Sequence, residues 1–318
     1  MEVSFAASAA ELEELARPLL EERLEHNVVA TVLAAVAAHG DHFPDALFAS
    51  VKAGGVIVAA ALRTPPRQLL ATTMDEAVAA ALMEAWLERD PAPPGVAAPE
   101  PAAGLIAAAF ELTSRRSAAL RREMAAHRLE RVIAPARPAS GSLRAAERSD
   151  RALLIEWTEA FGHDTGMYAG DAEAVVERSL EHGLRFLWED AGEAVSMVGF
   201  NPPVAGVVRV GPVYTPPSRR GSGYASSAVA AISALALERG ARACMLFTDL
   251  ANPTSNRIYA AVGYERFADW GEYEFSGGGV DRDAATQAPG EVNTAKNASP
   301  WVSISLPPCA ARAARISR

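Results

Sequence analysis

Cysteine is scarce in this sequence, which has only Cys244 and Cys309 among its 318 residues. Two thiols are too few for a disulfide framework or a cysteine metal site, and their scarcity indicates the reducing cytoplasm. Only His39 and His42 of the six histidines lie within four residues of each other, so no histidine-rich metal centre is predicted either. We therefore expect a cytoplasmic protein without a metal cofactor.

Long apolar runs are also missing. No stretch of about 18 residues is free of charge, proline and glycine, and the acidic residues Glu11, Glu13 and Glu14 interrupt any signal-peptide core near Met1. Neither a transmembrane span nor a signal peptide is expected. The net charge of −9 at pH 7 repels nucleic acid and anionic membrane surfaces, so neither is an expected partner. An anionic ligand would have to be held by a local feature.

The chain is long enough for two domains of ordinary size. The stretch 135–142 is rich in proline, alanine, serine and glycine, which is typical of a linker. The predicted division is a first domain over 1–134, this linker, and a second domain over 143–275. Residues 276–318 contain three successive glycines and many polar residues, and we expect a disordered tail.

The two predicted domains can be aligned with each other. Placing Pro65-Pro66 on Pro202-Pro203 also brings Gly55 onto Gly192 and a hydrophobic strand onto each side of the turn. Both halves share a predicted order of two helices, a hairpin, then strand, helix, strand, helix and strand. This shared order predicts a tandem repeat.

Some elements are predicted from local signals alone. A helix over 11–25 is expected to break at Pro18, and Asp150 is expected to be the N-cap of a helix that reaches residue 161. Two separate strands are expected at 264–267 and 272–275.

One loop in the second domain has the features of a phosphate site. It joins a β-branched strand at 206–210 to an alanine-rich helix at 226–239. Glycines at positions 221 and 223 let the main chain approach a ligand closely, and Arg219 and Arg220 supply positive charge. Because the loop also adjoins the positive end of a helix dipole, we predict that it binds phosphate.

The strand before this loop contains Pro212 directly after Gly211. Proline lacks the N–H that a sheet partner needs, which predicts a bulge or the loss of that partner. The backbone groups of Val213 and Tyr214 would then be free to bind an extended amide-containing ligand. An edge strand without a ligand is the alternative interpretation.

The first domain lacks such a loop. Its matching segment reads Thr72-Thr73-Met74-Asp75-Glu76, and no glycine follows Pro66 before Gly95. Two carboxylates at the start of the next helix repel phosphate and interact with the helix dipole themselves. We expect no phosphate ligand in this half.

A second segment of interest follows at 247–264. Asn252 is a suitable helix N-cap and Pro253 a suitable first helical residue. Ser255 and Tyr259 lie four residues apart, so their hydroxyl groups share a helix face. A purely structural cap at Asn252 and a packed aromatic ring at Tyr259 are the alternative interpretations.

Together the two segments closely resemble the GNAT superfamily of N-acetyltransferases, over about residues 142–275. The resemblance is carried by Arg220-x-x-Gly223-x-Ala225 after a bulged strand, and by Asn252 to Tyr259 followed by Val262-Gly263-Tyr264. It implies an α/β (α+β) fold of two tandem GNAT-like domains. Each would be a mixed, mostly antiparallel sheet flanked by helices, with a parallel strand pair that splays apart. The first copy is expected to be degenerate and the second catalytic.

The resemblance also implies acetyl-CoA as the acyl donor. Amides of the loop would hold the pyrophosphate of coenzyme A, and the pantetheine arm would lie between the strands that end near Tyr214 and Thr248. Tyr259 would protonate the departing thiolate. The residues expected to bind the cofactor are Val213, Tyr214, Thr215, Arg219, Arg220, Gly221, Ser222, Gly223, Tyr224, Ala225, Asn252 and Ser255.

The implied reaction is direct attack of a small-molecule amine on the thioester, with a backbone N–H near Val213 stabilising the oxyanion. The amine must also lose a proton, yet the strand 206–213 contains no carboxylate. Asp249 is one candidate base, and a base acting through water is another possibility. The remaining candidates are Glu156, Glu159, His163 and Asp164.

Two other functions stay open at this point. The missing base and the degenerate first half also fit a non-catalytic acyl-CoA-binding or scaffold protein. A nucleotide-binding module is disfavoured, because no Gly-Lys-Ser/Thr sequence and no acidic ribose-binding residue follow the loop. The sequence leaves the acceptor amine and the oligomeric state open.

Overall fold

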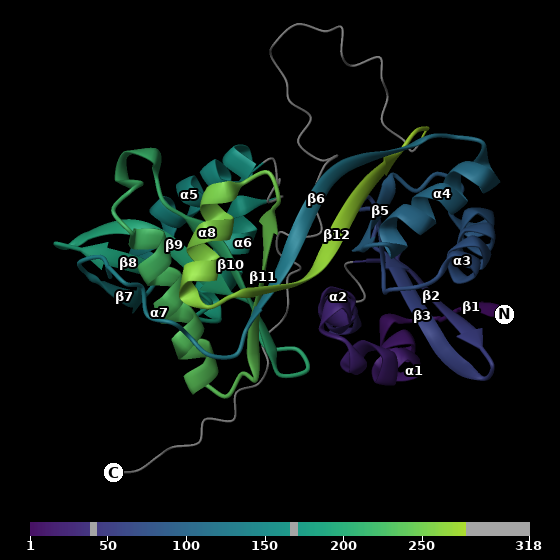
Figure 1. Cartoon of the computed structure of the whole chain (residues 1–318), viewed down its shortest axis with the longest axis horizontal. Helices are drawn as coiled ribbons and strands as arrows, with labels where there is room; N and C mark the ends of the chain where they lie inside the picture. Colours follow the sequence, from purple (N-terminus) through teal and green to yellow (C-terminus); the bar gives the residue numbers. More distant parts are fainter. Residues whose placement is uncertain (39–42, 166–170, 278–318) are drawn as a thin grey trace, which may run out of the picture.

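The structure is a computed structural model that describes residues 1–38, 43–165 and 171–277 (Figure 1). The tail predicted at 276–318 lies outside the described residues from position 278 onward. No helix within the described ranges is long and apolar enough to cross a membrane.

The described α-helices and strands occur twice in the same order. The first half contains β1 (Glu2–Phe5), α1 (Ala9–Glu22), the 3-10 helix η1 (Leu24–His26), α2 (Asn27–Ala38), β2 (Leu47–Ala53), β3 (Val56–Arg63), β4 (Leu69–Ala71), α3 (Glu76–Arg89), β5 (Gly95–Pro99), α4 (Ala102–Ser114) and β6 (Ala118–Leu129). The second contains β7 (Ser142–Ala145), η3 (Arg148–Asp150), α5 (Arg151–Thr165), α6 (Ala172–Glu181), β8 (Arg185–Asp190), β9 (Glu193–Phe200), β10 (Val207–Tyr214), η4 (Pro217–Arg219), α7 (Tyr224–Glu238), β11 (Ala243–Asp249), α8 (Pro253–Val262) and β12 (Glu265–Phe275). The fold is thus α/β, laid out as two copies of one unit.

The strands of both halves belong to one mixed sheet. Their order is β1-β2-β3-β4-β5-β12-β6-β11-β10-β9-β8-β7. The pairs β4/β5 and β10/β11 are parallel, and the other pairs are antiparallel. The order reads alike from both ends when each strand is replaced by its counterpart in the other copy.

The two copies exchange their last strands at the centre of this sheet. β12 from the second half pairs with β5, where Trp270 lies opposite Pro99, and β6 from the first half pairs with β11, where Leu129 lies opposite Cys244. β6 and β12 also pair with each other. Figure 1 shows them as two long strands, side by side between the halves. Each half therefore completes the sheet of the other.

The helices cover both faces of the sheet. α1 and α2 pack on one face of the first half, against Phe48 and Leu62, while α3 and α4 pack on the other, against Ala61 and Leu69. This arrangement follows from the alternation of side chains along a strand. In the second half α5 and α6 pack against Leu187 on one face, and α7 packs on the opposite face.

The core beneath α1 and α2 also crosses into the second half. It includes Val207 of β10 and Met245 of β11, and the Nδ2 atom of Asn27 donates to the carbonyl of Val204 at 3.2 Å. The halves therefore share a hydrophobic core as well as a sheet.

Three local predictions were wrong. α1 continues through Pro18. Pro18 and Glu14, whose carbonyl loses its helical partner, are both exposed, so water can replace the lost hydrogen bond. The two strands predicted near the C-terminal end are one strand, β12, because it pairs continuously with β6 across two register shifts and also pairs with β5 from Trp270 to Glu274. Asp150 lies in η3 and accepts from the N–H of Glu147 at 2.8 Å, so it does not cap α5.

The predicted linker at 135–142 is packed against the second half. The indole N–H of Trp188 donates to the carbonyl of Ser140 at 2.7 Å, and the N–H of Ala139 donates to the hydroxyl of Ser227 at 2.9 Å. The halves on either side of this segment share one sheet and one core. We therefore propose the division at 134 and 143 as the boundary between the two copies in the sequence.

Candidate functional site

The candidate site begins where β10 and β11 separate. These strands pair only from Val207 to Arg209, opposite residues 243–245. Beyond that point β10 continues along β9 with a register shift between Val210 and Val213, while β11 continues along β6. The bulge predicted from Gly211-Pro212 is confirmed, and so is the loss of a strand partner.

The separation leaves backbone groups of Val213 facing the side of β11. The carbonyl of Tyr214 is directed toward β9, where it accepts from the hydroxyl of Ser196 at 2.9 Å. Because neighbouring residues of a strand direct their backbone groups to opposite edges, those of Val213 point the other way. The hydroxyl of Thr215 also lies 2.9 Å from that of Ser196. Of the two residues predicted to pair with an extended ligand, Val213 has the suitable orientation.

The loop after β10 ends in an uncapped helix N-terminus. Gly223 is the N-cap residue of α7, with φ of 81°, and no side chain of the described residues caps this end. Gly221 also has a positive φ, of 87°, which other residues rarely adopt. The first N–H groups of a long helix are thus left for a ligand, and the helix dipole favours an anion there.

Both arginines of the loop are paired with carboxylates. Nη2 of Arg220 lies 2.6 Å from Oδ2 of Asp164 on α5, and its Nε donates to the carbonyl of Thr215 at 2.9 Å. Arg219 forms an ion pair with Glu193. These pairs are exposed and contribute little stability, so a phosphate group can compete for either guanidinium.

The first residue of α7 is held in place by the β8–β9 turn. The hydroxyl of Tyr224 donates to Oδ2 of Asp190 at 2.7 Å, and the hydroxyl of Ser140 donates to the same atom at 2.8 Å. The hydrogen bond from Tyr224, followed by that from Ser140, lowers the pKa of Asp190. This contact connects the start of α7 to the β8–β9 turn. Ser222, two residues before Tyr224, is exposed.

Helix α8 starts with a satisfied cap. Oδ1 of Asn252 accepts from the N–H of Ser255 at 3.1 Å, as its sequence pattern predicted. Asn252 is exposed and Ser255 is half-buried. The capping interpretation of Asn252 is thus confirmed, and a contact with a cofactor stays a prediction.

The matching place in the first half is built differently. There β4 ends at Ala71 and α3 begins at Glu76, without a long loop between them. Oδ1 of Asp75 accepts from the N–H of Val78 at 2.8 Å and so caps α3. A carboxylate occupies the helix end that would otherwise attract an anion.

Comparison with known proteins agrees with this geometry. The sequence model described as the acetyltransferase (GNAT) family matches residues 151–264. Residues 151–264 are a GNAT acetyltransferase domain. No curated protein sequence matches the chain.

Solved structures resemble the whole two-copy layout. An acetyltransferase from the GNAT family of Colwellia psychrerythraea is 12% identical, with a TM-score of 0.56 over 87% of this chain and 100% of its own. A GCN5-related N-acetyltransferase from Kribbella flavida is 19% identical, with a TM-score of 0.54 over 80% of this chain and 96% of its own. A tandem GNAT protein from the clavulanic acid biosynthesis pathway is 16% identical, with a TM-score of 0.50 over 86% of this chain and 98% of its own. At these identities the likeness concerns the fold alone.

Tyr259 of the GNAT domain is half-buried on α8. Its ring meets that of Tyr264 edge-on, with centroids 6.0 Å apart. Burial raises the pKa of Tyr259 to about 12, so the hydroxyl keeps its proton at neutral pH. Among the described residues that hydroxyl has no hydrogen-bonding partner, which leaves it available to a ligand.

The candidate bases are dispersed around the GNAT domain. Oδ1 of Asp249 accepts from the N–H of Ala251 at 2.7 Å, within the turn that follows β11. Asp164 is paired with Arg220, which lowers its pKa. The remaining candidates are exposed on α5: Glu156, Glu159 and His163. Asp164 is the only one of the five with a described contact to the loop residues predicted to bind the cofactor.

One buried polar cluster beside β11 was not predicted from the sequence. Nε2 of His127, on β6, lies 3.2 Å from the hydroxyl of Thr248, and that hydroxyl also bonds to Asn256 of α8. Burial lowers the pKa of His127. No local signal could have revealed this cluster, because it depends on the exchange of strands between the copies. No group of three or more potential metal ligands occurs in the part of the chain that the structure describes.

Proposed function

We propose that the chain is an acetyl-CoA-dependent N-acetyltransferase for a small-molecule amine, with one active site in the second copy. The observation that carries the proposal is the uncapped N-terminus of α7, which adjoins the separated strands β10 and β11 inside the GNAT domain. A ligand with phosphate at the helix and an extended amide chain between the strands has the chemical features of coenzyme A.

The residues present fit this cofactor. The amides from Arg220 to Ala225 surround the start of α7, and the positive φ values of Gly221 and Gly223 bring the main chain around without Cβ atoms in the way. Bound acetyl-CoA would supply a thioester carbonyl that an amine can attack. The guanidinium groups of Arg219 and Arg220 would add positive charge to the phosphate site once phosphate replaces their carboxylate partners, Glu193 and Asp164.

Two groups of the proposed site have chemistry that suits this reaction. The N–H of Val213 faces the side of β11 and can donate to an oxygen that gains negative charge. The hydroxyl of Tyr259 holds a proton that it can give to a sulfur leaving group. We assign Tyr259 as general acid and Val213 as oxyanion donor on these grounds.

The base is the least constrained role. Asp249 stands at the end of β11, but its carboxylate already accepts a hydrogen bond from the turn. Exposed carboxylates on α5 can take a proton through water. We therefore propose that a water molecule carries the proton of the ammonium to solvent or to one of these groups.

The direct test is a thiol-release assay of the full chain with acetyl-CoA and a broad panel of primary amines, beside calorimetric titration with coenzyme A. We expect binding of coenzyme A with one site per chain, and turnover with some amines. Binding without turnover on any amine would support the non-catalytic acyl-CoA-binding alternative. That alternative is favoured by the two candidate bases that already have partners, Asp249 and Asp164. No binding of coenzyme A would overturn both.

A further inference from the structure

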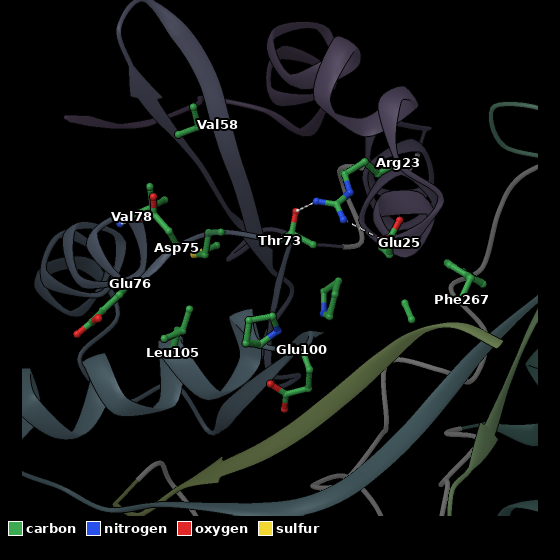
Figure 2. Close-up of a pocket in the computed structure, with 14 residues that line it drawn as sticks. Arg23, Glu25, Val58, Thr73, Asp75, Glu76, Val78, Glu100, Leu105 and Phe267 are labelled. Carbon is green, nitrogen blue, oxygen red and sulfur yellow. Dashed lines mark hydrogen bonds and ion pairs between the residues drawn. The ribbon is translucent and has the colours of Figure 1, made fainter.

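The first half contains a cavity of about 680 Å³. Its volume is within the range of small-molecule sites. Its walls come from η1, β3, the start of α3, the turn between β5 and α4, and the exchanged strand β12. Figure 2 shows one residue from each of these walls, namely Glu25, Val58, Glu76, Glu100 and Phe267, and also Leu105 of α4.

The cavity lies at the topological equivalent of the candidate site in the second half. β4 and β5 are the parallel pair of the first copy, and the cavity adjoins their C-terminal ends and the starts of α3 and α4. Open α/β sheets bind ligands outside the carboxyl ends of such strands. The first copy thus keeps the location of a ligand site after losing the loop that would bind phosphate.

Carboxylates predominate at this location, whereas the matching loop of the second copy carries two arginines. Of the four carboxylates that line the cavity, only Glu25 has an ion-pair partner among the described residues, namely Arg23 at 3.1 Å. Asp75, Glu76 and Glu100 form no ion pair with a described residue. The lining therefore carries a net negative charge, which repels a phosphate and attracts a cation.

The carboxylates of Glu123 and Asp269 add to the negative potential at Glu100. Burial is the largest cause that raises the pKa of the Glu100 carboxyl, and these two carboxylates raise it further. A Cβ atom on Gly271 would lie 2.1 Å from Oε1 of Glu100, so glycine at this position of β12 makes room for the carboxylate. The second half thus supplies part of the wall that places Glu100.

Apart from Arg23 and Thr73, the rest of the lining is apolar. It includes Val58, Val78, Leu105 and Phe267, which can bury a hydrocarbon body. We propose that this cavity binds a small organic cation, a primary ammonium group carried on an apolar body, and that it is distinct from the acetyl-transfer site. The charged group lies toward Asp75 and Glu76, and the body lies against Val58 and Leu105.

The test uses the full chain and three probes of one shape: 4-fluorobenzylamine, 4-fluorobenzyl alcohol and 4-fluorobenzoate, titrated at neutral pH by fluorine NMR. We expect saturable binding of the amine, at least about tenfold tighter than that of the alcohol, and no binding of the benzoate. Equal affinity for amine and alcohol, or preference for the benzoate, would overturn the proposal.

Variants locate the site. Asp75→Asn retains a side chain that can cap α3, so with Glu76→Gln it removes charge at little structural cost, and we expect about fivefold weaker binding of the amine. Leu105→Trp adds bulk at the place where the apolar body of the amine is proposed to lie, and it should abolish that binding. Circular dichroism checks that each variant is folded.

Tyr259→Phe is the control for the acetyl-transfer site and should leave the amine titration unchanged. Unaltered binding in both the charge variant and Leu105→Trp would sink the proposal, whether or not the chain acetylates any amine. Loss of binding in Tyr259→Phe alone would assign the amine to the second copy instead.

Discussion

Asp164, near the end of α5, places Oδ2 at 2.6 Å from Nη2 of Arg220 in the loop before α7. This ion pair connects the helices of one face of the second half to the loop proposed to bind the pyrophosphate. A carboxylate and a phosphate would compete for the same guanidinium group.

Replacing Asp164 by asparagine should therefore strengthen the binding of coenzyme A. We expect a dissociation constant about two- to fivefold lower at low ionic strength, measured by calorimetry. The gain should vanish near 1 M salt, where charges are screened over about 3 Å. Glu159→Gln, an exposed change on the same helix, is the control and should have no effect. Weaker binding in Asp164→Asn would show that the carboxylate orients Arg220 and does not compete with phosphate.

Replacing Tyr259 by phenylalanine should lower turnover by about 100-fold and leave the affinity for coenzyme A nearly unchanged. The reason is that the change removes one proton donor and keeps the packed ring. Steady-state kinetics with the best amine from the panel, together with calorimetry, measures both quantities. An equal loss of affinity and turnover would contradict the role of general acid.

Tyr264→Phe is the matched control for that experiment. The hydroxyl of Tyr264 lies 2.8 Å from that of Ser233 in the core, and its removal should lower the free energy of unfolding by about 1 kcal/mol without a comparable loss of turnover.

The cap at Asp75 gives a prediction about stability. Asp75→Ala should lower the free energy of unfolding by about 1 kcal/mol, because the N–H of Val78 loses its acceptor. Asp75→Asn should change it by only a few tenths, since asparagine caps equally well. Urea unfolding of the three proteins measures the difference. Equal destabilisation by both substitutions would mean that the charge of Asp75, and not its hydrogen bond, stabilises α3.

Acid should destabilise the fold through buried histidines. Nε2 of His26 lies 3.2 Å from the N–H of Thr73 and can accept from it only when that nitrogen is unprotonated. Burial lowers the pKa of His26, as it does that of His127. The unfolded chain therefore binds more protons, so this contribution to stability is present above about pH 6.5 and is lost as the pH falls below it.

Urea unfolding between pH 7.5 and 5 measures this loss, and His26→Gln should flatten the slope in that window. The acidic groups with lowered pKa values, such as Asp150, titrate at lower pH and do not interfere. An unchanged slope in the variant would exclude His26 as a source of the pH dependence.

The sequence predicted those parts of the fold and site that depend on local chemistry. Helix α8 begins at Pro253 with Asn252 as its N-cap, as expected, because these two residues are strong signals side by side in the sequence. The bulge at Gly211-Pro212 and the absence of a phosphate loop before α3 were predicted for the same reason.

What the sequence could not predict rests on contacts between distant residues. The exchange of β6 and β12 cannot be predicted from local sequence, because each segment has the pattern of an ordinary last strand of its own copy. The same is true of the pairing of Arg220 with Asp164 and of the cavity wall around Phe267, which belongs to the other half of the chain. Substrate preference depends on such contacts as well.

The exchanged strands also limit how this protein can evolve, because neither copy can be deleted without damage to the sheet of the other. Deleting residues 1–134 would take β6 away from β11, and deleting residues 143–275 would take β12 away from β5. Either loss exposes a long central strand edge, which is prone to aggregation. A gene that carries this arrangement can lose the chemistry of one copy through mutation, but it cannot discard that copy.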